Sequence, residues 1–211
     1  GLTITADEYV VDKSKPFILL CHQARYSRGE HIETAKKLNE LGFNCIAIDL
    51  RSGGEVKGVK NETYQRAMEQ KKPVNYLDAE QDMLASVNYI LKKYSKKVIL
   101  FGSSYSASLA LKTGKENDRV IAVVAFSPGE YFGPDLPLKQ AIKGLSKPVF
   151  AASSKSEASS VTELLQLIDP ARLTRYIPSV ESVHGSRALW KENSDSEYCW
   201  SALTKFLETL K

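Results

Sequence analysis

The chain has 211 residues, which suffices for one sizeable α/β core and is too short for two comfortable domains. Hydrophobic residues make up 43% and charged residues 26%, an ordinary globular composition, and the net charge of +4 comes from scattered basic residues. Nucleic-acid binding needs a concentrated basic stripe, and a membrane span needs about 18 consecutive apolar residues. We therefore expect no nucleic-acid partner and no membrane span, while the oligomeric state is left open.

The three cysteines, Cys21, Cys45 and Cys199, have no metal-like spacing, and their odd number argues against a disulfide framework. Cys21 and Cys45 fall inside strand-like runs, where a small hydrophobic residue is expected. The chain begins with Gly1 rather than Met, so an export signal can have been removed before it. Cytoplasmic and exported locations both stay open.

Apolar runs alternate with amphipathic segments along the chain. Strands are expected within residues 2–11 and at 17–21, 43–50, 98–101, 120–126, 148–152 and 175–179. Helices are expected at 28–41, 62–70 and 77–94, from 106 onwards, and at 138–145, 161–168 and 198–210. This alternation predicts a single α/β domain over residues 1–211, with a mostly parallel central sheet and helices on both faces.

Three local patterns concern the segments between these elements. Ser27 and Glu30 fit a capping box at the start of the first helix. Residues 55–76 are polar and weakly patterned, and we interpret them as an insertion over the sheet edge that borders a pocket. Asn61-Glu-Thr63 matches the motif for N-glycosylation, and we interpret the match as a chance occurrence.

The stretch from Val98 to Ala110 carries the strongest functional signal. Four residues of a buried strand are followed by a tight turn of small residues and then by a helix. A hydroxyl at this turn is therefore forced outward at the C-terminal edge of the sheet. Ser104 is flanked two residues away by Gly102 and Ser106, as a strained nucleophile turn requires, whereas Ser103 has the bulky Phe101 behind it. The alternative is a serine-rich turn that only caps the helix.

A serine nucleophile needs a base, and the chain has three histidines. We expect His31 to be a solvated residue of the first helix, and the loop at His22 to supply backbone amides. His184 lies in a late loop before Gly185, which lets the ring reach over the sheet edge, so His184 is the predicted base. The alternative is a loop histidine without a role.

The base in turn needs an acid to orient it, and four carboxylates follow strands beyond the turn: Glu130, Asp135, Glu157 and Asp169. Asp169 follows a helix, and its Asp-Pro pair resembles a helix stop. Glu157 comes five residues after the strand at 148–152, among small serines, and is favoured. Glu130 remains its rival, and each carboxylate can equally be a surface charge.

At these residues the chain resembles the α/β-hydrolase superfamily, close to the small dienelactone hydrolase-like and carboxylesterase branch. The resemblance covers nearly the whole chain from Phe17 onwards. His22-Gln23-Ala24 resembles the family's His-Gly-x oxyanion loop, and Asp49–Gly54 resembles its D-x-R-G-x-G stretch. The chain order serine, acid, histidine is also similar to that of the family.

The resemblance implies a single α/β-hydrolase domain with little or no lid and no cofactor or metal. It implies these roles: Ser104 as nucleophile, His184 as base, Glu157 as acid, and the backbone amides of Tyr105 and Ala24 as oxyanion hole. Gln23 and Arg25 stand beside this loop as candidate substrate-binding residues, although Arg25 can also face solvent.

The implied function is a serine hydrolase that cleaves a carboxylic ester or thioester of a small molecule through an acyl-enzyme intermediate. Gln23 and Ser106 replace glycines of the family pattern, and Glu157 is longer than the usual aspartate. A non-catalytic binding protein on the same fold is therefore the alternative, and peptidase or acyltransferase activity is the alternative among enzymes. Substrate identity and acyl-chain length are not encoded in any motif.

Overall fold

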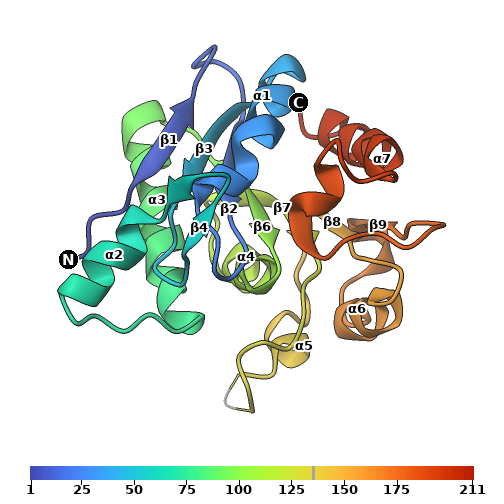
Figure 1. Cartoon of the computed structure of the whole chain (residues 1–211). Coiled ribbons are helices and arrows are strands. Elements are labelled where there is room, and N and C mark those ends of the chain that lie inside the picture. Colours follow the sequence, from blue (N-terminus) through green and yellow to red (C-terminus); the bar gives the residue numbers. More distant parts are fainter. Residues whose placement is uncertain (135) are drawn as a thin grey trace.

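The apolar runs assemble into one seven-stranded sheet in a computed structural model that describes residues 1–134 and 136–211 (Figure 1). The strands follow one another across the sheet as β1 (Ala6–Tyr9), β3 (Asn44–Ile48), β2 (Phe17–Cys21), β6 (Val98–Ser103), β7 (Val120–Phe126), β8 (Val149–Ala152) and β9 (Leu173–Tyr176). The edge strand β1 is antiparallel to β3, and all other pairs in the sheet are parallel. A separate hairpin is formed by β4 (Glu55–Val56) and β5 (Val59–Lys60).

Helices cover both faces of the sheet, as the alternating pattern predicts. They are α1 (Ile32–Glu40), α2 (Glu62–Glu69), α3 (Glu80–Tyr94), α4 (Tyr105–Glu116), α5 (Leu138–Ala141), α6 (Ala158–Leu165) and α7 (Ser196–Glu208). Short 3₁₀ turns occur at Arg28–His31, Leu77–Ala79, Pro170–Arg172 and Gly185–Leu189. The helices α3, α4, α5 and α6 pack on one face, and α1 and α7 pack on the other. The predicted α/β-hydrolase fold class is confirmed.

The central strands are buried on both faces, which explains their continuous apolar sequences. In β2, every residue is fully buried, and Phe17 pairs with Asn44 of β3 on one side and Val98 of β6 on the other. The three cysteines are free and buried. Burial raises the pKa of the Cys21 and Cys45 thiols far above the ordinary value, and that of Cys199 to about 12.

Several element boundaries differ from the sequence expectation. The predicted strand at 175–179 is β9, which ends at Tyr176, two residues before Pro178. The predicted helix at 138–145 is only the four-residue α5, and a helix that reached residue 145 is ruled out by the left-handed φ of 77° at Gly144. The first α-helix begins at Ile32, after a 3₁₀ turn, rather than at residue 28.

The prediction that His31 is a solvated surface residue is wrong. His31 is fully buried at the end of that 3₁₀ turn, with its ring edge-on to Phe101 at 5.4 Å between ring centroids. Burial lowers the pKa of His31, so the imidazole is neutral at pH 7. The end of this turn therefore faces Phe101 of β6 rather than solvent.

The segment predicted as an insertion divides into two parts. The hairpin and α2 attach to the N-terminal part of the chain, where the Ser27 hydroxyl donates to the Val59 carbonyl at 2.7 Å and the Thr5 amide donates to Thr63 Oγ1 at 2.9 Å. Asn61 is 1% exposed and caps α2 by accepting from the Tyr64 amide, so the folded chain does not offer it for glycosylation. The chain then returns toward the C-terminal edge of the sheet at residues 74–77.

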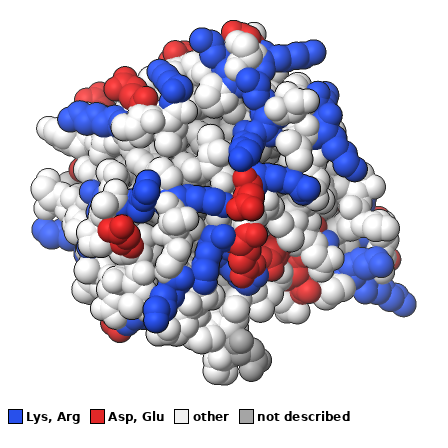
Figure 2. Space-filling model, turned by 180° about the vertical axis from the view of Figure 1, so that it is seen from behind, with Lys and Arg blue, Asp and Glu red and all other residues white. Residues whose placement is uncertain are grey.

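On one face of the molecule, the surface charge is interspersed rather than concentrated. Figure 2 shows one whole face, on which Lys and Arg side chains lie among Asp and Glu side chains and uncharged residues. Within the part of the chain that the structure describes, no helix is both long and apolar enough to cross a membrane.

Candidate active site

Ser104 stands at a strained turn between β6 and α4. Its backbone has φ 61° and ψ −126°, a left-handed conformation that is unfavourable for a residue other than glycine, and its amide donates to the Phe126 carbonyl at 2.8 Å. A Cβ on Gly102 would lie 2.4 Å from the Ser106 carbonyl oxygen and 2.5 Å from backbone atoms of Ala107. The turn is therefore too tight for a side chain at residue 102, as the elbow pattern predicts.

Ser106 does more than leave room at this turn. Its Oγ accepts from the Ser103 amide at 2.8 Å and lies 2.9 Å from the carbonyl oxygens of Cys21 and Ser103. The hydroxyl thus ties the turn to the end of β2. A glycine, which the family pattern has at this position, offers no such group.

The imidazole of His184 faces the carboxylate of Glu157. His184 Nδ1 is hydrogen-bonded to Glu157 Oε1, and Glu157 Oε2 accepts from the Ser127 hydroxyl at 2.7 Å and the Ser154 amide at 3.1 Å. Burial raises the pKa of Glu157, but hydrogen bonds from His184, Ser127 and Ser154 and the charge of His184 outweigh it and bring that pKa down to about 2. Glu157 is therefore a carboxylate at neutral pH.

Ser127 connects this pair to the turn that carries Ser104. It follows β7 directly, has φ 51°, and its Oγ accepts from the Gly185 amide at 2.9 Å while donating to Glu157. Phe126, the residue before it, accepts the Ser104 amide. Ser104 and the loop of His184 consequently lie at the same C-terminal edge of the sheet, although the two residues are 80 positions apart in the sequence.

Glu30 lies beneath these loops and is the main departure from the sequence expectation. The capping box predicts that its carboxylate binds the Ser27 amide, but Oε2 accepts from the Gln23 amide at 2.7 Å. Oε1 accepts from the hydroxyls of Ser103 at 2.7 Å and Ser186 at 2.6 Å. Ser27 keeps its half of the pattern and accepts from the Gly29 amide at 3.2 Å. The fully buried Glu30 thus joins three loops of the site.

The other described acid candidates form hydrogen bonds away from His184. Glu130 caps α5, because its carboxylate accepts from the amides of Leu138 at 2.6 Å and Lys139 at 2.9 Å. Asp169 accepts from the Ala171 amide at 2.9 Å at the start of a 3₁₀ turn. Asp135 lies outside the described residues. Of the described candidates, Glu157 is the one that the structure brings to His184.

The predicted oxyanion loop follows β2. His22 is fully buried, with Nε2 accepting from the Leu50 amide at 2.9 Å and Nδ1 placed 2.7 Å from the Gln23 carbonyl oxygen, and burial lowers its pKa. This imidazole is a structural support for the loop. The amide of Ala24, farther along the loop, and that of Tyr105, the first residue of α4, have no hydrogen-bond acceptor among the described residues.

The two candidate substrate-binding residues differ in position. Gln23 is 6% exposed, and its side-chain oxygen would lie 2.9 Å from a Cβ placed on Gly185, so the amide packs against the histidine loop. Arg25 is exposed and has a left-handed φ of 64°. Contact of either side chain with a substrate stays a prediction.

Sequence reasoning missed two groups that the structure places at the site. Ser127 bridges the acid and the histidine loop, and Tyr131 directs its hydroxyl to the Ser127 carbonyl at 3.0 Å. Burial raises the pKa of Tyr131, and the side chain of Ser104 beside the phenol partly opposes this. The one available signal was a serine directly after a buried strand, in Ser127-Pro-Gly, at the edge where Ser104 also lies.

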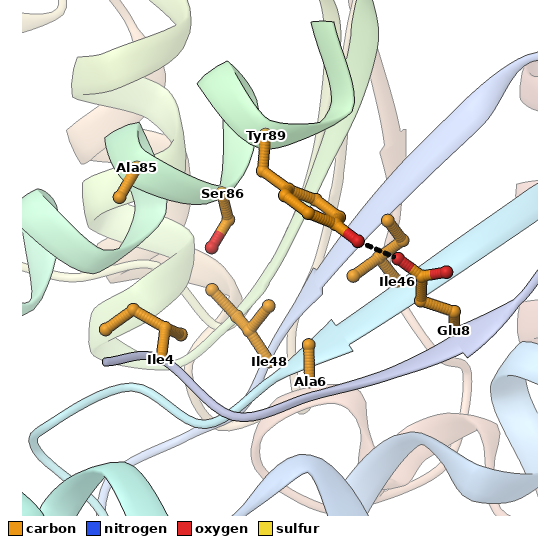
Figure 3. A pocket seen from close by; sticks show the side chains of 8 residues that line it. All are labelled: Ile4, Ala6, Glu8, Ile46, Ile48, Ala85, Ser86 and Tyr89. Atoms are coloured by element: carbon orange, nitrogen blue, oxygen red, sulfur yellow. Dashed lines mark hydrogen bonds between the residues drawn. The ribbon is translucent and has the colours of Figure 1, made fainter. Parts of the chain in front are cut away.

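A separate hollow lies at the β1 edge of the sheet. Its volume is about 370 Å³, and Figure 3 shows it between the N-terminal strand, β3 and α3, with the Tyr89 hydroxyl donating to Glu8 at 2.7 Å. Its serine, Ser86, donates to the Asp82 carbonyl within α3. Three positions of the strand order separate β1 from β6, so this hollow is not part of the site around Ser104.

Comparison with known proteins agrees with the fold. Residues 6–175 match the model of the dienelactone hydrolase family. Among curated proteins, none matches the sequence significantly.

Solved structures with the same fold include three hydrolases. A dienelactone hydrolase from Anabaena variabilis has a TM-score of 0.72 and 16% identity, covering 98% of this chain and 91% of that chain. The Pyrococcus furiosus esterase PF2001 has a TM-score of 0.69 and 18% identity, covering 99% and 93%. A monoacylglycerol lipase from Paleococcus ferrophilus has a TM-score of 0.70 and 11% identity, covering 99% and 100%. Because the family model matches most of the length of this chain, the chain belongs to the dienelactone hydrolase family.

Proposed function

We propose that this protein is a serine hydrolase that cleaves a carboxylic ester or thioester of a small molecule through an acyl-enzyme intermediate. The observation that carries the proposal is the hydrogen-bonded chain from Glu157 to His184, joined through Ser127 to the edge where Ser104 takes its left-handed φ of 61°. Family membership and the esterase and lipase among the similar structures support the same reaction class.

The proposed first step is acylation of Ser104. With Nδ1–H donating to Glu157, the Nε2 of His184 is the ring atom left to accept the Ser104 hydroxyl proton. The Oγ attacks the substrate carbonyl carbon, and the tetrahedral oxyanion is bound by the amides of Tyr105 and Ala24. Each such donor contributes about 3 kcal/mol in comparable sites. The intermediate collapses, and the alcohol or thiol leaves with the proton held by His184.

Deacylation repeats these roles with water as the nucleophile. His184 accepts a proton from water, the hydroxide attacks the acyl carbon, and the second tetrahedral intermediate releases the carboxylic acid while Ser104 recovers its proton. The carboxylate of Glu157, with its pKa held near 2, keeps the imidazole in one tautomer and stabilises its transient positive charge.

The test is labelling with a fluorophosphonate probe, read by mass spectrometry of the modified peptide. We expect the probe to label Ser104, and Ser104→Ala to lose both labelling and hydrolysis of a short-chain nitrophenyl ester. Ser201→Ala is the matched control, because Ser201 is an exposed serine on α7 and its loss leaves both signals intact. A folded wild-type protein that is neither labelled nor active on esters or thioesters would instead support the non-catalytic binding protein.

A further inference from the structure

A cleft of about 380 Å³ opens beside the turn of Ser104. Its lining consists of two short segments, one before α3 and one after β7, namely Val74, Asn75, Tyr76, Leu77, Tyr131 and Phe132. This volume is at the lower end of the range for small-molecule sites. The cleft therefore fits a substrate of modest size.

Both walls of the cleft are connected to Ser104. On one side, the ring of Tyr76 stacks on the ring of Tyr105, the residue after Ser104, with 4.5 Å between centroids and 19° between planes. On the other side, the Tyr131 hydroxyl donates to the Ser127 carbonyl at 3.0 Å, and its phenol lies beside the Ser104 side chain. A group that occupies the cleft is thus next to the proposed nucleophile.

The walls are also held in place independently of any ligand. The Ser52 hydroxyl donates to the Asn75 carbonyl at 2.7 Å, and the Asn75 amide donates to Asp78 at 2.8 Å. The absence of a side chain at Gly129 leaves space for the Tyr131 ring, since a Cβ on Gly129 would lie 2.9 Å from the ring carbon that bears the hydroxyl. The site is accordingly preformed, which reduces the entropy lost on binding.

The lining has no charged side chain: Val74, Leu77 and Phe132 are apolar, and Asn75 and the two tyrosines add neutral polar groups. Tyr76 and Leu77 remain 39% and 37% exposed, which is a high exposure for large apolar side chains. Burying a substrate carboxylate against such a surface, without a charged partner, is unfavourable, whereas burying an apolar chain is favourable.

Two arginines near the oxyanion loop, Arg28 and Arg51, are already paired. Arg28 binds Asp49 at 2.7 Å and also contacts Asp7 and Glu62. Arg51 binds the buried Asp82 at 2.7 Å. Neither guanidinium is available to a substrate anion without breaking an existing ion pair.

We propose that this cleft is the substrate subsite and that it selects uncharged esters with a medium-length apolar chain over esters that carry a carboxylate. The inference rests on the proposed function, because it assigns the substrate class of the same Ser104 site. Leu77 and Phe132 are the specificity-determining side chains. Unlike Tyr76 and Tyr131, neither stacks on or hydrogen-bonds to residues around Ser104.

The experiment compares two nitrophenyl esters whose acyl chains have equal numbers of carbon atoms, the hexanoate and the adipate monoester. We expect kcat/KM for the uncharged hexanoate to exceed that for the anionic adipate by about tenfold or more. Leu77→Ser and, as a second variant, Phe132→Ser are expected to lower kcat/KM for the hexanoate by about tenfold and for the acetate by much less. Tyr198→Ser is the matched control, because Tyr198 is 71% exposed on α7.

Labelling of Ser104 by a small fluorophosphonate distinguishes a failure of this substrate preference from a failure of the proposed function. If Ser104 is labelled but the adipate is preferred, or if both variants keep the wild-type preference for the hexanoate over the acetate, this inference is wrong and the proposed function stands. Arg25 and Arg187 would then be the cations to examine. If folded protein is not labelled, the proposed function fails and this inference fails with it.

Discussion

Ser186 and Glu30 are 156 positions apart in the chain, and the hydroxyl of Ser186 donates a 2.6 Å hydrogen bond to the buried carboxylate of Glu30. The same carboxylate accepts from Ser103 and from the Gln23 amide. The loop of the predicted base, the turn of the predicted nucleophile and the predicted oxyanion loop therefore share one anchor. Its loss is expected to affect all three loops together.

We predict that Glu30→Gln destabilises the fold by about 2 to 3 kcal/mol, because the amide has one acceptor oxygen for donors on both sides and leaves at least one buried donor unpaired. Urea unfolding at neutral pH measures the effect. Glu163→Gln is the control, since that side chain is 74% exposed in a surface ion pair, and it is expected to cost less than about 1 kcal/mol. Equal unfolding midpoints for the two variants would contradict this role of Glu30.

The second prediction distinguishes the two acid candidates by activity. Glu157→Gln should lower kcat for ester hydrolysis by about 10³ to 10⁴-fold, because the neutral amide no longer selects the correct tautomer of His184 or stabilises its charge. Glu130→Gln should retain near wild-type kcat, since that carboxylate caps α5. The measurement is steady-state hydrolysis of one nitrophenyl ester by both variants. The reverse pattern would make Glu130 the acid.

The third prediction concerns acid stability. The folded-state pKa of Glu157, about 2, lies below its ordinary value of 4.5, so folding is favoured by ionised Glu157. This stabilisation is complete above about pH 4.5 and is lost as the pH falls toward 2. We expect the unfolding free energy of the wild type to fall more steeply than that of Glu157→Gln between these pH values. Parallel curves from urea titrations would argue against an ionised Glu157 in the folded protein.

The fourth prediction is that completing the glycine pattern of the elbow does not improve the protein. Ser106→Gly removes the hydroxyl that binds the Ser103 amide and the Cys21 carbonyl, so we expect a loss of about 1 to 3 kcal/mol. Ser106→Ala removes the same hydroxyl but keeps the Cβ, which separates the hydrogen bonds from backbone flexibility. Thermal unfolding of both variants provides the comparison. A more stable glycine variant would show that the hydroxyl is dispensable.

The sheet was predictable because its central strands are buried on both faces and therefore carry unbroken apolar sequences, such as Phe17–Cys21 and Val120–Phe126. The turn at Ser104 was predictable for a related reason, since its tight geometry restricts residue size locally. Both signals lie within a few consecutive residues, where a single sequence carries the most information.

The role of Glu30 was not predictable, because its partners Ser103 and Ser186 lie 73 and 156 positions away. The spacing of Ser27 and Glu30 fitted a capping box, and a tertiary contact replaced half of it. His31 was assigned to the surface for the same reason, since a turn next to a helix start gave no sign that it faces the sheet. The choice between Glu130 and Glu157 likewise depends on which loop meets His184, which sequence order does not determine.

The reactivity of the three buried thiols reports local or global unfolding of the protein. Cys21 and Cys45 lie on neighbouring strands of the sheet and Cys199 lies on α7, and their raised pKa values make them unreactive while the fold is closed. Modification by a thiol reagent must then wait for local or global opening. The order in which the three positions react would show whether α7 detaches from the sheet before its strands separate.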